Sequence, residues 1–364
     1  MIRLVLLLAL LTAAAVLPAA VRQAHASQAH LSQELRPLTS DERAILQSIR
    51  EDPAPKVLLG QAPGLENKHY LAGNEWHLYL YGEKLKGIGG AFMGVGSDQC
   101  YLLMGMQRPT LAVLSDYDDV VVAIHSIYFA FFEEGATRQE FLALWQQDNA
   151  AKALAVLERR LPASADKKGL LRLYRVARAK IAKRLARVAK SFAAHKVASF
   201  VSDDATYGFI RQLVQTGRVR AVRVDLLANQ GVQSIGEAAR KLAIPFKVIY
   251  LSNAENYWRY TAQYRSNVAA LPIDPQGWLV RTVSTWNHNY DYIYDLQPLG
   301  NYAAWVSKTW VTGYRDFVRI AVPTVDEFRL SSTQPDPEAA EKARSKPASK
   351  SKPPRATPTP QHAG

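Results

Sequence analysis

The sequence predicts an α/β domain built around a mostly parallel β-sheet, with a segment of different composition at each end. Short apolar runs alternate with helix-like stretches between residues 87 and 330, which favours parallel strands joined by helices. Four of these runs end in polar residues, as strands that line a ligand crevice do. Hydrophobic residues make up 48% and charged residues 21% of the 364-residue chain, which excludes a wholly disordered, a fibrous and a polytopic membrane protein.

The first 26 residues have the pattern of an export signal. Arg3 precedes an apolar run over residues 4–17, and the Ala-His-Ala sequence at 24–26 fits the small-x-small pattern before a cleavage site. We therefore expect a periplasmic or secreted protein that begins at Ser27. The alternative is an uncleaved N-terminal membrane anchor, because the apolar run approaches the ~20 residues that span a bilayer. A single cysteine, Cys100, suits an oxidising compartment and excludes a multi-cysteine zinc site.

Composition divides the rest of the chain into three parts. Residues 27–86 are expected to form an N-terminal helical or irregular extension, and residues 87–330 the α/β domain. Residues 331–364 contain no aromatic residue and are rich in Pro, Ser, Ala, Lys and Thr. Such a segment buries too little apolar surface to offset its ordering entropy, so it is predicted to be a disordered tail.

One segment, about residues 167–196, holds most of the formal net charge of +13, with eleven Lys and Arg and no carboxylate. Apolar residues recur there at steps of three and four, which predicts a long helix with one packed face: Leu170, Tyr174, Ala177, Ile181, Leu185, Val188 and Phe192. The helix is either a surface helix with a solvated basic face, or a docking surface for an anionic membrane or an acidic envelope polymer. Nucleic acid is the partner least expected for an exported protein.

The first predicted strand, residues 91–95, ends in a glycine-rich turn that contains Gly94 and Gly96. Glycines allow a sharp turn and a close approach of the backbone to a ligand, and the helix that follows presents free N–H groups. A second strand, residues 110–114, leads to Asp116. The glycines and this acid are about twenty residues apart, the spacing at which nucleotide-binding units place an acid on a ribose. Alternatively, the two glycines only form a tight turn between strand and helix.

Two later strands also end in polar residues. Residues 220–226 reach Asp225, and residues 246–251 lead into a polar run. Ligands of open α/β sheets bind beyond the carboxyl ends of the strands, which predicts a crevice lined by four such ends. Singly, each acid could instead cap a helix. Residues 280–284 and 290–296 predict a pair of strands that closes the sheet antiparallel, and His288 has no partner at metal-ligand spacing, so no metal is assigned.

Four sequence blocks carry a resemblance to a known fold: GVGSDQ at 94–99, SDD at 202–204, IYLSNAENYW at 249–258 and YDLQP at 294–298. Together they resemble a group of uncharacterised bacterial proteins whose domain is similar to class I S-adenosylmethionine-dependent methyltransferases. The resemblance covers roughly residues 87–322. It implies a Rossmann-like, methyltransferase-like sheet into which the long basic helix is inserted.

The resemblance also implies roles for individual residues. Gly94, Gly96 and Asp98 would lie along the methionine end of a nucleoside cofactor. Asp116 would face its ribose and Asp225 its adenine edge. The remaining candidates would hold the cofactor or face the reacting centre: Gln99, Ser252, Asn253 and Glu255.

Two functions follow, and the sequence leaves open whether the protein is an enzyme. The first is an exported, non-catalytic envelope protein that binds a small ligand in a methyltransferase-like crevice. The alternative is an S-adenosylmethionine-dependent methyltransferase for a small or envelope-derived substrate, with Asn253 and Glu255 orienting the nucleophile. The export signal stands against the enzyme, since S-adenosylmethionine is made and used in the cytoplasm.

Overall fold

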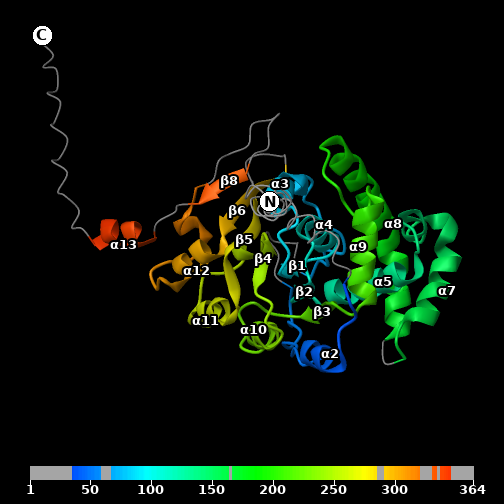
Figure 1. Cartoon of the computed structure of the whole chain (residues 1–364), viewed down its shortest axis with the longest axis horizontal. Helices are drawn as coiled ribbons and strands as arrows, with labels where there is room; N and C mark the ends of the chain where they lie inside the picture. Colours follow the sequence, from blue (N-terminus) through cyan, green and yellow to red (C-terminus); the bar gives the residue numbers. More distant parts are fainter. Residues whose placement is uncertain are drawn as a thin grey trace, which may run out of the picture.

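The computed structural model describes residues 35–58, 67–163, 166–284, 291–319, 330–333 and 337–345 (Figure 1). The predicted export signal, its cleavage after Ala26, and His288 lie outside these ranges. In the described part of the chain, no helix is long and apolar enough to cross a membrane.

A mostly parallel sheet runs through the molecule in the order β3-β2-β1-β4-β5-β6-β8-β7. Its parallel strands are β1 (Ala91–Val95), β2 (Leu111–Asp116), β3 (Val219–Arg223), β4 (Phe246–Ser252) and β5 (Ile273–Ser284). The remaining strands are β6 (Tyr292–Pro298), antiparallel to β5 as predicted, β7 (Val318–Arg319) and β8 (Leu330–Thr333). The chain moves outward from β1 to β3 and then returns to β4, so a topological switch point lies between β1 and β4. The predicted mixed α/β, Rossmann-like class is confirmed at this level.

Helices cover both faces of the sheet because side chains alternate along each buried strand. Phe92 belongs to the core of one face and its neighbour Met93 to the core of the other. The first face carries α3 (Gly82–Leu85), α4 (Asp98–Gln107), α5 (Asp119–Glu134), α6 (Arg138–Ala143), α7 (Ala150–Arg160), α8 (Lys167–Ala194) and α9 (Asp204–Gln215). The second face carries α2 (Ser40–Gln47), α10 (Gly231–Lys241), α11 (Ala262–Ala270) and α12 (Leu299–Ser307) (Figure 1).

The long helix α8 packs against α5 and α7. It begins after Asp166, whose side chain accepts a hydrogen bond from the Gly169 backbone N–H at 2.9 Å. All seven residues of the apolar stripe are buried, and so is one cation, Arg184. The stripe therefore fixes the face on which α8 packs, and the other cations lie on the remaining faces.

Two parts of the tail that composition predicts to be disordered have regular structure. Strand β8 pairs with β6, and α13 (Pro337–Ser345) lies beside α12. The Lys308 ammonium at the end of α12 contacts Glu338 at 2.5 Å and Glu341 at 2.7 Å. Composition counts only the apolar surface of the segment itself, whereas the folded domain supplies partners for these two parts.

The segment predicted as an N-terminal extension contributes to the core of the α/β domain. Leu71, Leu78 and Leu85 are buried against the first face of the sheet. Residues 78–81 form a 3₁₀ turn that continues into α3. Between Asn67 and His77 the chain has no helix or strand and lies over the carboxyl ends of the sheet strands.

Candidate functional site

The predicted crevice coincides with the place where residues 67–77, here called the strap, cross the sheet. One end of the strap is tied to the N-terminus of α5, where His69 Nδ1 lies 2.8 Å from Asp118. The other end is tied beside β6, where the His77 backbone N–H donates to the Tyr294 hydroxyl at 2.9 Å. The strap therefore occupies the space beyond β1, β2 and β4, three of the four strand ends at which the sequence predicts a ligand, and it also reaches β5 at Thr282. The end of the fourth predicted strand, β3 with Asp225, has no hydrogen bond to the strap among the described residues.

Asp98, predicted to hold a cofactor, is fully buried and bonded to the strap and to α8. Its carboxylate accepts from the Gly73 backbone N–H at 2.6 Å and pairs with Arg184 Nε at 2.9 Å. Gln99 accepts from the Ser97 backbone N–H through its side-chain oxygen, at 3.1 Å. Both polar residues at the start of α4 thus already have partners within the chain.

The glycines of the predicted cofactor loop have structural reasons for being glycine. Gly96 has a φ of +93°, a conformation that other residues rarely adopt, and a Cβ there would lie 2.7 Å from Gln99 Nε2. A Cβ at Gly94 would lie 2.5 Å from the Phe92 ring and 3.0 Å from Cys100 Sγ. These contacts support the alternative in which the two glycines form a tight turn between strand and helix.

Asp116 lies at the end of β2, as predicted, and accepts the Asp118 backbone N–H at 3.0 Å. Burial raises the pKa of Asp116 to about 7, and the negative charge of Asp118 adds to that effect. Asp118 caps α5 by accepting the Val120 backbone N–H at 2.9 Å and also holds His69. The two acids therefore organise the turn into α5 and the first anchor of the strap.

Three other predicted residues lie in different places in the structure. Asp225 follows β3 and accepts the Leu227 backbone N–H at 2.9 Å within its own turn. Asn253 donates to Ser284 Oγ at 3.4 Å, between the ends of β4 and β5. Ser252 donates to Glu75 of the strap at 2.7 Å. Of these three, Ser252 is the one that the structure joins directly to the strap.

Glu75 is a residue of this site that the sequence did not point to. The residue is 1% exposed, and its carboxylate accepts hydrogen bonds from three hydroxyls: Tyr250 and Ser252 of β4 and Thr282 of β5. Burial raises the pKa of Glu75, while the three hydroxyls and the charge of Arg184 oppose that shift. A lone Glu in an irregular segment carries no motif, so only the folded contacts identify it.

Comparison with known families decides where the strap belongs. A family model described as a domain of unknown function, DUF7790, matches residues 70–326, well over half of the chain. The chain belongs to the DUF7790 family. The matched range begins within the strap, so residues 70–77 are part of the DUF7790 domain and not a separate extension. No curated protein matches the chain.

Glu255, predicted to orient a nucleophile, belongs to a second buried cluster of the DUF7790 domain. It is 4% exposed, lies 3.3 Å from Arg281 Nε and accepts a hydrogen bond from the Tyr260 hydroxyl. Asp295 lies 3.5 Å from the same guanidinium nitrogen. Burial raises the pKa of Asp295 to about 6, against the opposing charge of Arg281, and Glu255 raises it further. These contacts tie β5, β6 and the chain after β4 together and leave Glu255 in the interior.

In the DUF7790 domain, the strap therefore provides partners for Asp98, Asp118 and Ser252 at the strand ends, whereas Nη1 and Nη2 of Arg184 have no hydrogen-bond partner among the described residues. Among the described residues, no group of three or more His, Cys, Asp or Glu is arranged to hold a metal ion. A small apolar pocket lies on the second face of the sheet, where Met93, Ile249 and Leu271 are among its lining residues. The site offers hydroxyl donors and one guanidinium for the recognition of polar or anionic groups. In this conformation the same donors contact the strap.

Proposed function

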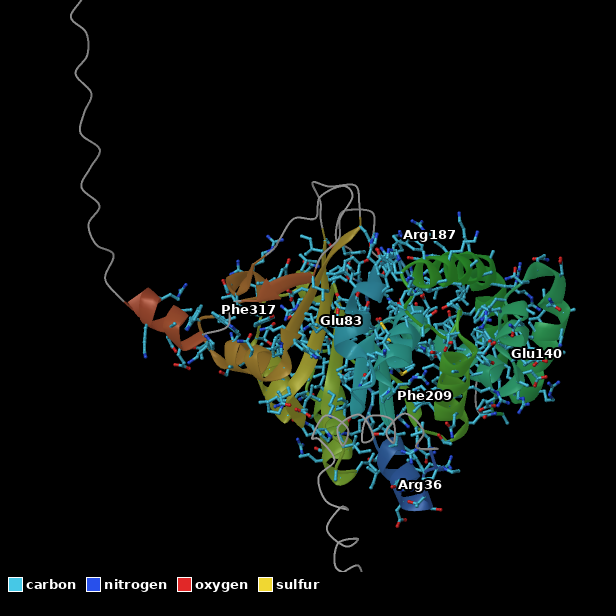
Figure 2. All side chains as sticks on the ribbon, turned by 45° about the horizontal axis from the view of Figure 1, so that its top comes forward. Arg36, Glu83, Glu140, Arg187, Phe209 and Phe317 are labelled. Carbon is cyan, nitrogen blue, oxygen red and sulfur yellow. The ribbon has the colours of Figure 1, made fainter. Side chains whose placement is uncertain are left out.

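We propose that this protein is a non-catalytic binding protein of the cell envelope that docks on anionic membrane surfaces through the outer face of α8. The observation that carries the proposal is a row of exposed cations along that helix. Figure 2 labels Arg187 on α8, where it is exposed although its guanidinium also stacks on Trp76 of the strap. The exposed cations of the helix are Lys168, Arg172, Arg175, Lys180, Lys183, Arg187 and Lys190.

These cations are not neutralised within the described part of the chain. The ion pair that α8 makes there is that of buried Arg184 with Asp98, and the exposed cations have no carboxylate partner among the described residues. The pKa of Lys180 is lowered by partial burial and by the nearby charge of Lys68. Like charges along one rod repel each other, so an external anionic surface would stabilise the folded protein.

A lipid surface fits this face better than a soluble acidic polymer does. Val176 is 76% exposed and lies on α8 between Arg172, Arg175 and Lys180. An apolar side chain that is exposed to water can enter the boundary between headgroups and acyl chains, while the surrounding cations contact lipid phosphates. The 28 residues of α8 form a rod about 42 Å long, which can lie flat on a bilayer.

Sedimentation with lipid vesicles tests the proposal. We expect the protein to bind phosphatidylglycerol-containing vesicles, to bind phosphatidylcholine vesicles weakly, and to dissociate as salt rises. Each cation near an anionic surface contributes about 1 kcal/mol, so the triple variant Arg172→Gln, Arg175→Gln, Lys183→Gln should bind roughly two orders of magnitude more weakly. The matched control changes three exposed lysines elsewhere, Lys56, Lys86 and Lys241, to Gln and should bind as the wild type.

Several results would contradict this docking surface. Equal binding to neutral vesicles, or equal losses in the two triple variants, would show that the face of α8 is not the determinant. Binding to lipopolysaccharide or another acidic polymer, without binding to anionic vesicles, would show that the partner is an acidic polymer and not a lipid surface. Export is a separate expectation, tested by mass spectrometry of the N-terminus of the protein from a fractionated native host.

A methyltransferase activity remains the second candidate, supported by the strand order 3-2-1-4-5 and by Asp116 at the end of β2. It requires the strap to leave, because the strap lies where the resemblance would put the cofactor. Isothermal titration of the mature protein with S-adenosylmethionine and S-adenosylhomocysteine separates the two functions. Heat of binding at millimolar ligand would favour the enzyme, and its absence together with an absent thermal shift would remove it.

A further inference from the structure

We infer that the crevice contains a binding site for a carboxylate group, which the strap fills with the chain's own Glu75. The site, here called the carboxylate seat, consists of the hydroxyls of Tyr250, Ser252 and Thr282, and the positive charge of Arg184 acts on it from nearby. A ligand that carries a carboxylate would compete with Glu75 for this seat when the strap moves away. This inference goes beyond the docking of α8 and does not depend on it.

The hydroxyl donors of the seat converge on two oxygen positions. One carboxylate oxygen of Glu75 accepts from Ser252 at 2.7 Å and from Thr282 at 2.8 Å, and the other accepts from Tyr250. The donors come from β4 and β5, two strands held side by side by the sheet, so the seat is rigid without the strap. Ser252 has a φ of +51°, a rare conformation for a residue with a side chain.

Arg184 supplies the positive charge near the seat. The residue is 1% exposed, and its Nη1 and Nη2 atoms have no hydrogen-bond partner among the described residues. A buried donor without a partner is costly, and a guanidinium readily binds a second oxyanion. A Cβ at Gly73 would lie 3.2 Å from Nη2, which places this nitrogen directly beneath Gly73 of the strap.

The strap is attached in a way that allows exchange. In the described part of the chain, no backbone–backbone hydrogen bond joins it to a strand of the sheet. Side chains hold it instead: His69 pairs with Asp118, and Asn74 donates to Tyr292 at 2.7 Å. Trp76 is half-buried and lies against two guanidinium groups, with the Arg187 group 3.7 Å from its ring centroid. Release of the strap therefore breaks no backbone pairing of the sheet, and its main packing cost is the exposure of Leu71 and Ala72, which are buried in the core of the first face.

The chemistry of the seat favours a carboxylate over other anions. Three hydroxyl donors reach two oxygens of one planar group, whereas a phosphate would bring further oxygens that these donors do not reach. Inorganic phosphate nevertheless shares the interaction with Arg184, so it serves as the competing probe.

The test removes Glu75 and offers a free carboxylate in its place. Glu75→Ala should be less thermally stable than the wild type, and sodium acetate or formate should raise its melting temperature by a few degrees, saturably, above sodium chloride of equal ionic strength. The wild type should show no such difference, because its own Glu75 fills the seat at a high effective concentration. A larger shift with phosphate than with acetate would overturn the assignment to carboxylates.

A second set of variants shows whether the acetate acts at the seat. Adding Ser252→Ala and Thr282→Val to Glu75→Ala should abolish the acetate shift, whereas adding Lys86→Gln, a change at an exposed site, should leave it. An equal acetate shift in these two multiple variants would overturn the proposal, and so would the absence of a shift in Glu75→Ala. The proposal would also fail if Glu75→Ala did not fold in either salt while Glu75→Gln folded.

Exchange of the strap is measured in the wild type. Hydrogen exchange should be faster at the backbone amides of Gly73 and Trp76, which donate to Asp98 and Asp291, than at amides of β4. Exchange as slow as in β4 would show that the strap does not leave the seat, and the proposal would fail.

Discussion

Replacing Arg184 by methionine tests whether the pair of Arg184 with Asp98 holds α8 to the start of α4. Methionine keeps an unbranched chain of similar length but removes the guanidinium, so Asp98 loses its ion-pair partner and keeps the Gly73 N–H and the more distant Ser97 hydroxyl. Removing one partner of a buried ion pair costs about 3–5 kcal/mol, since the other charge stays buried without compensation. The two unpaired nitrogens of Arg184 disappear as well, which offsets part of that loss. We therefore expect a loss near the lower end, about 3 kcal/mol.

Urea unfolding followed by tryptophan fluorescence measures this loss, with Arg187→Met as the control. Arg187 lies on the same helix and also stacks on Trp76, but it is exposed, so its replacement should cost less than about 1 kcal/mol. The double variant Asp98→Asn with Arg184→Met removes both charges and should be at least about 2 kcal/mol more stable than the sum of the single losses predicts. A loss below about 1 kcal/mol for Arg184→Met, or strict additivity, would refute the reasoning.

Two further predictions concern the crevice. Gly94→Ala should lower the free energy of unfolding by about 1–3 kcal/mol in the same assay, because the new methyl group would meet the Phe92 ring and Cys100; an unchanged stability would show that the turn yields without cost. The raised pKa of Asp116, about 7 against about 4 in the unfolded chain, means that the folded state keeps a proton which the unfolded state has lost. Stability from this group is thus present at acid pH and is lost as pH rises from about 4 through 7, by at most about 4 kcal/mol. Asp116→Asn should flatten that decline in urea titrations between pH 5 and 8, and an equally steep decline in the variant would count against the shift.

The sheet and α8 were accessible to the sequence because their signals are local. Strand ends at Gly94 and Asp116, the later strands, and the apolar stripe of α8 all follow from residues a few positions apart. Arg184 also had a local signal: it lies three residues after Ile181 and four before Val188, on the packed face of the helix. Arg178 has a similar spacing, four residues after Tyr174 and three before Ile181, yet it is only half-buried, so the phase neither singles out Arg184 nor indicates its partner.

The contents of the crevice were decided by tertiary structure alone. Glu75 meets Ser252 and Thr282 across 177 and 207 positions of the chain, and Asp98 meets Arg184 across 86. Sequence patterns indicate which side chains follow a strand. They do not indicate which distant segment of the chain contacts those side chains in the folded protein. Here the strap does so, because folding places an irregular segment of the same chain over the strand ends, where its Glu75 and Gly73 meet polar groups that would otherwise be left to a ligand or to water.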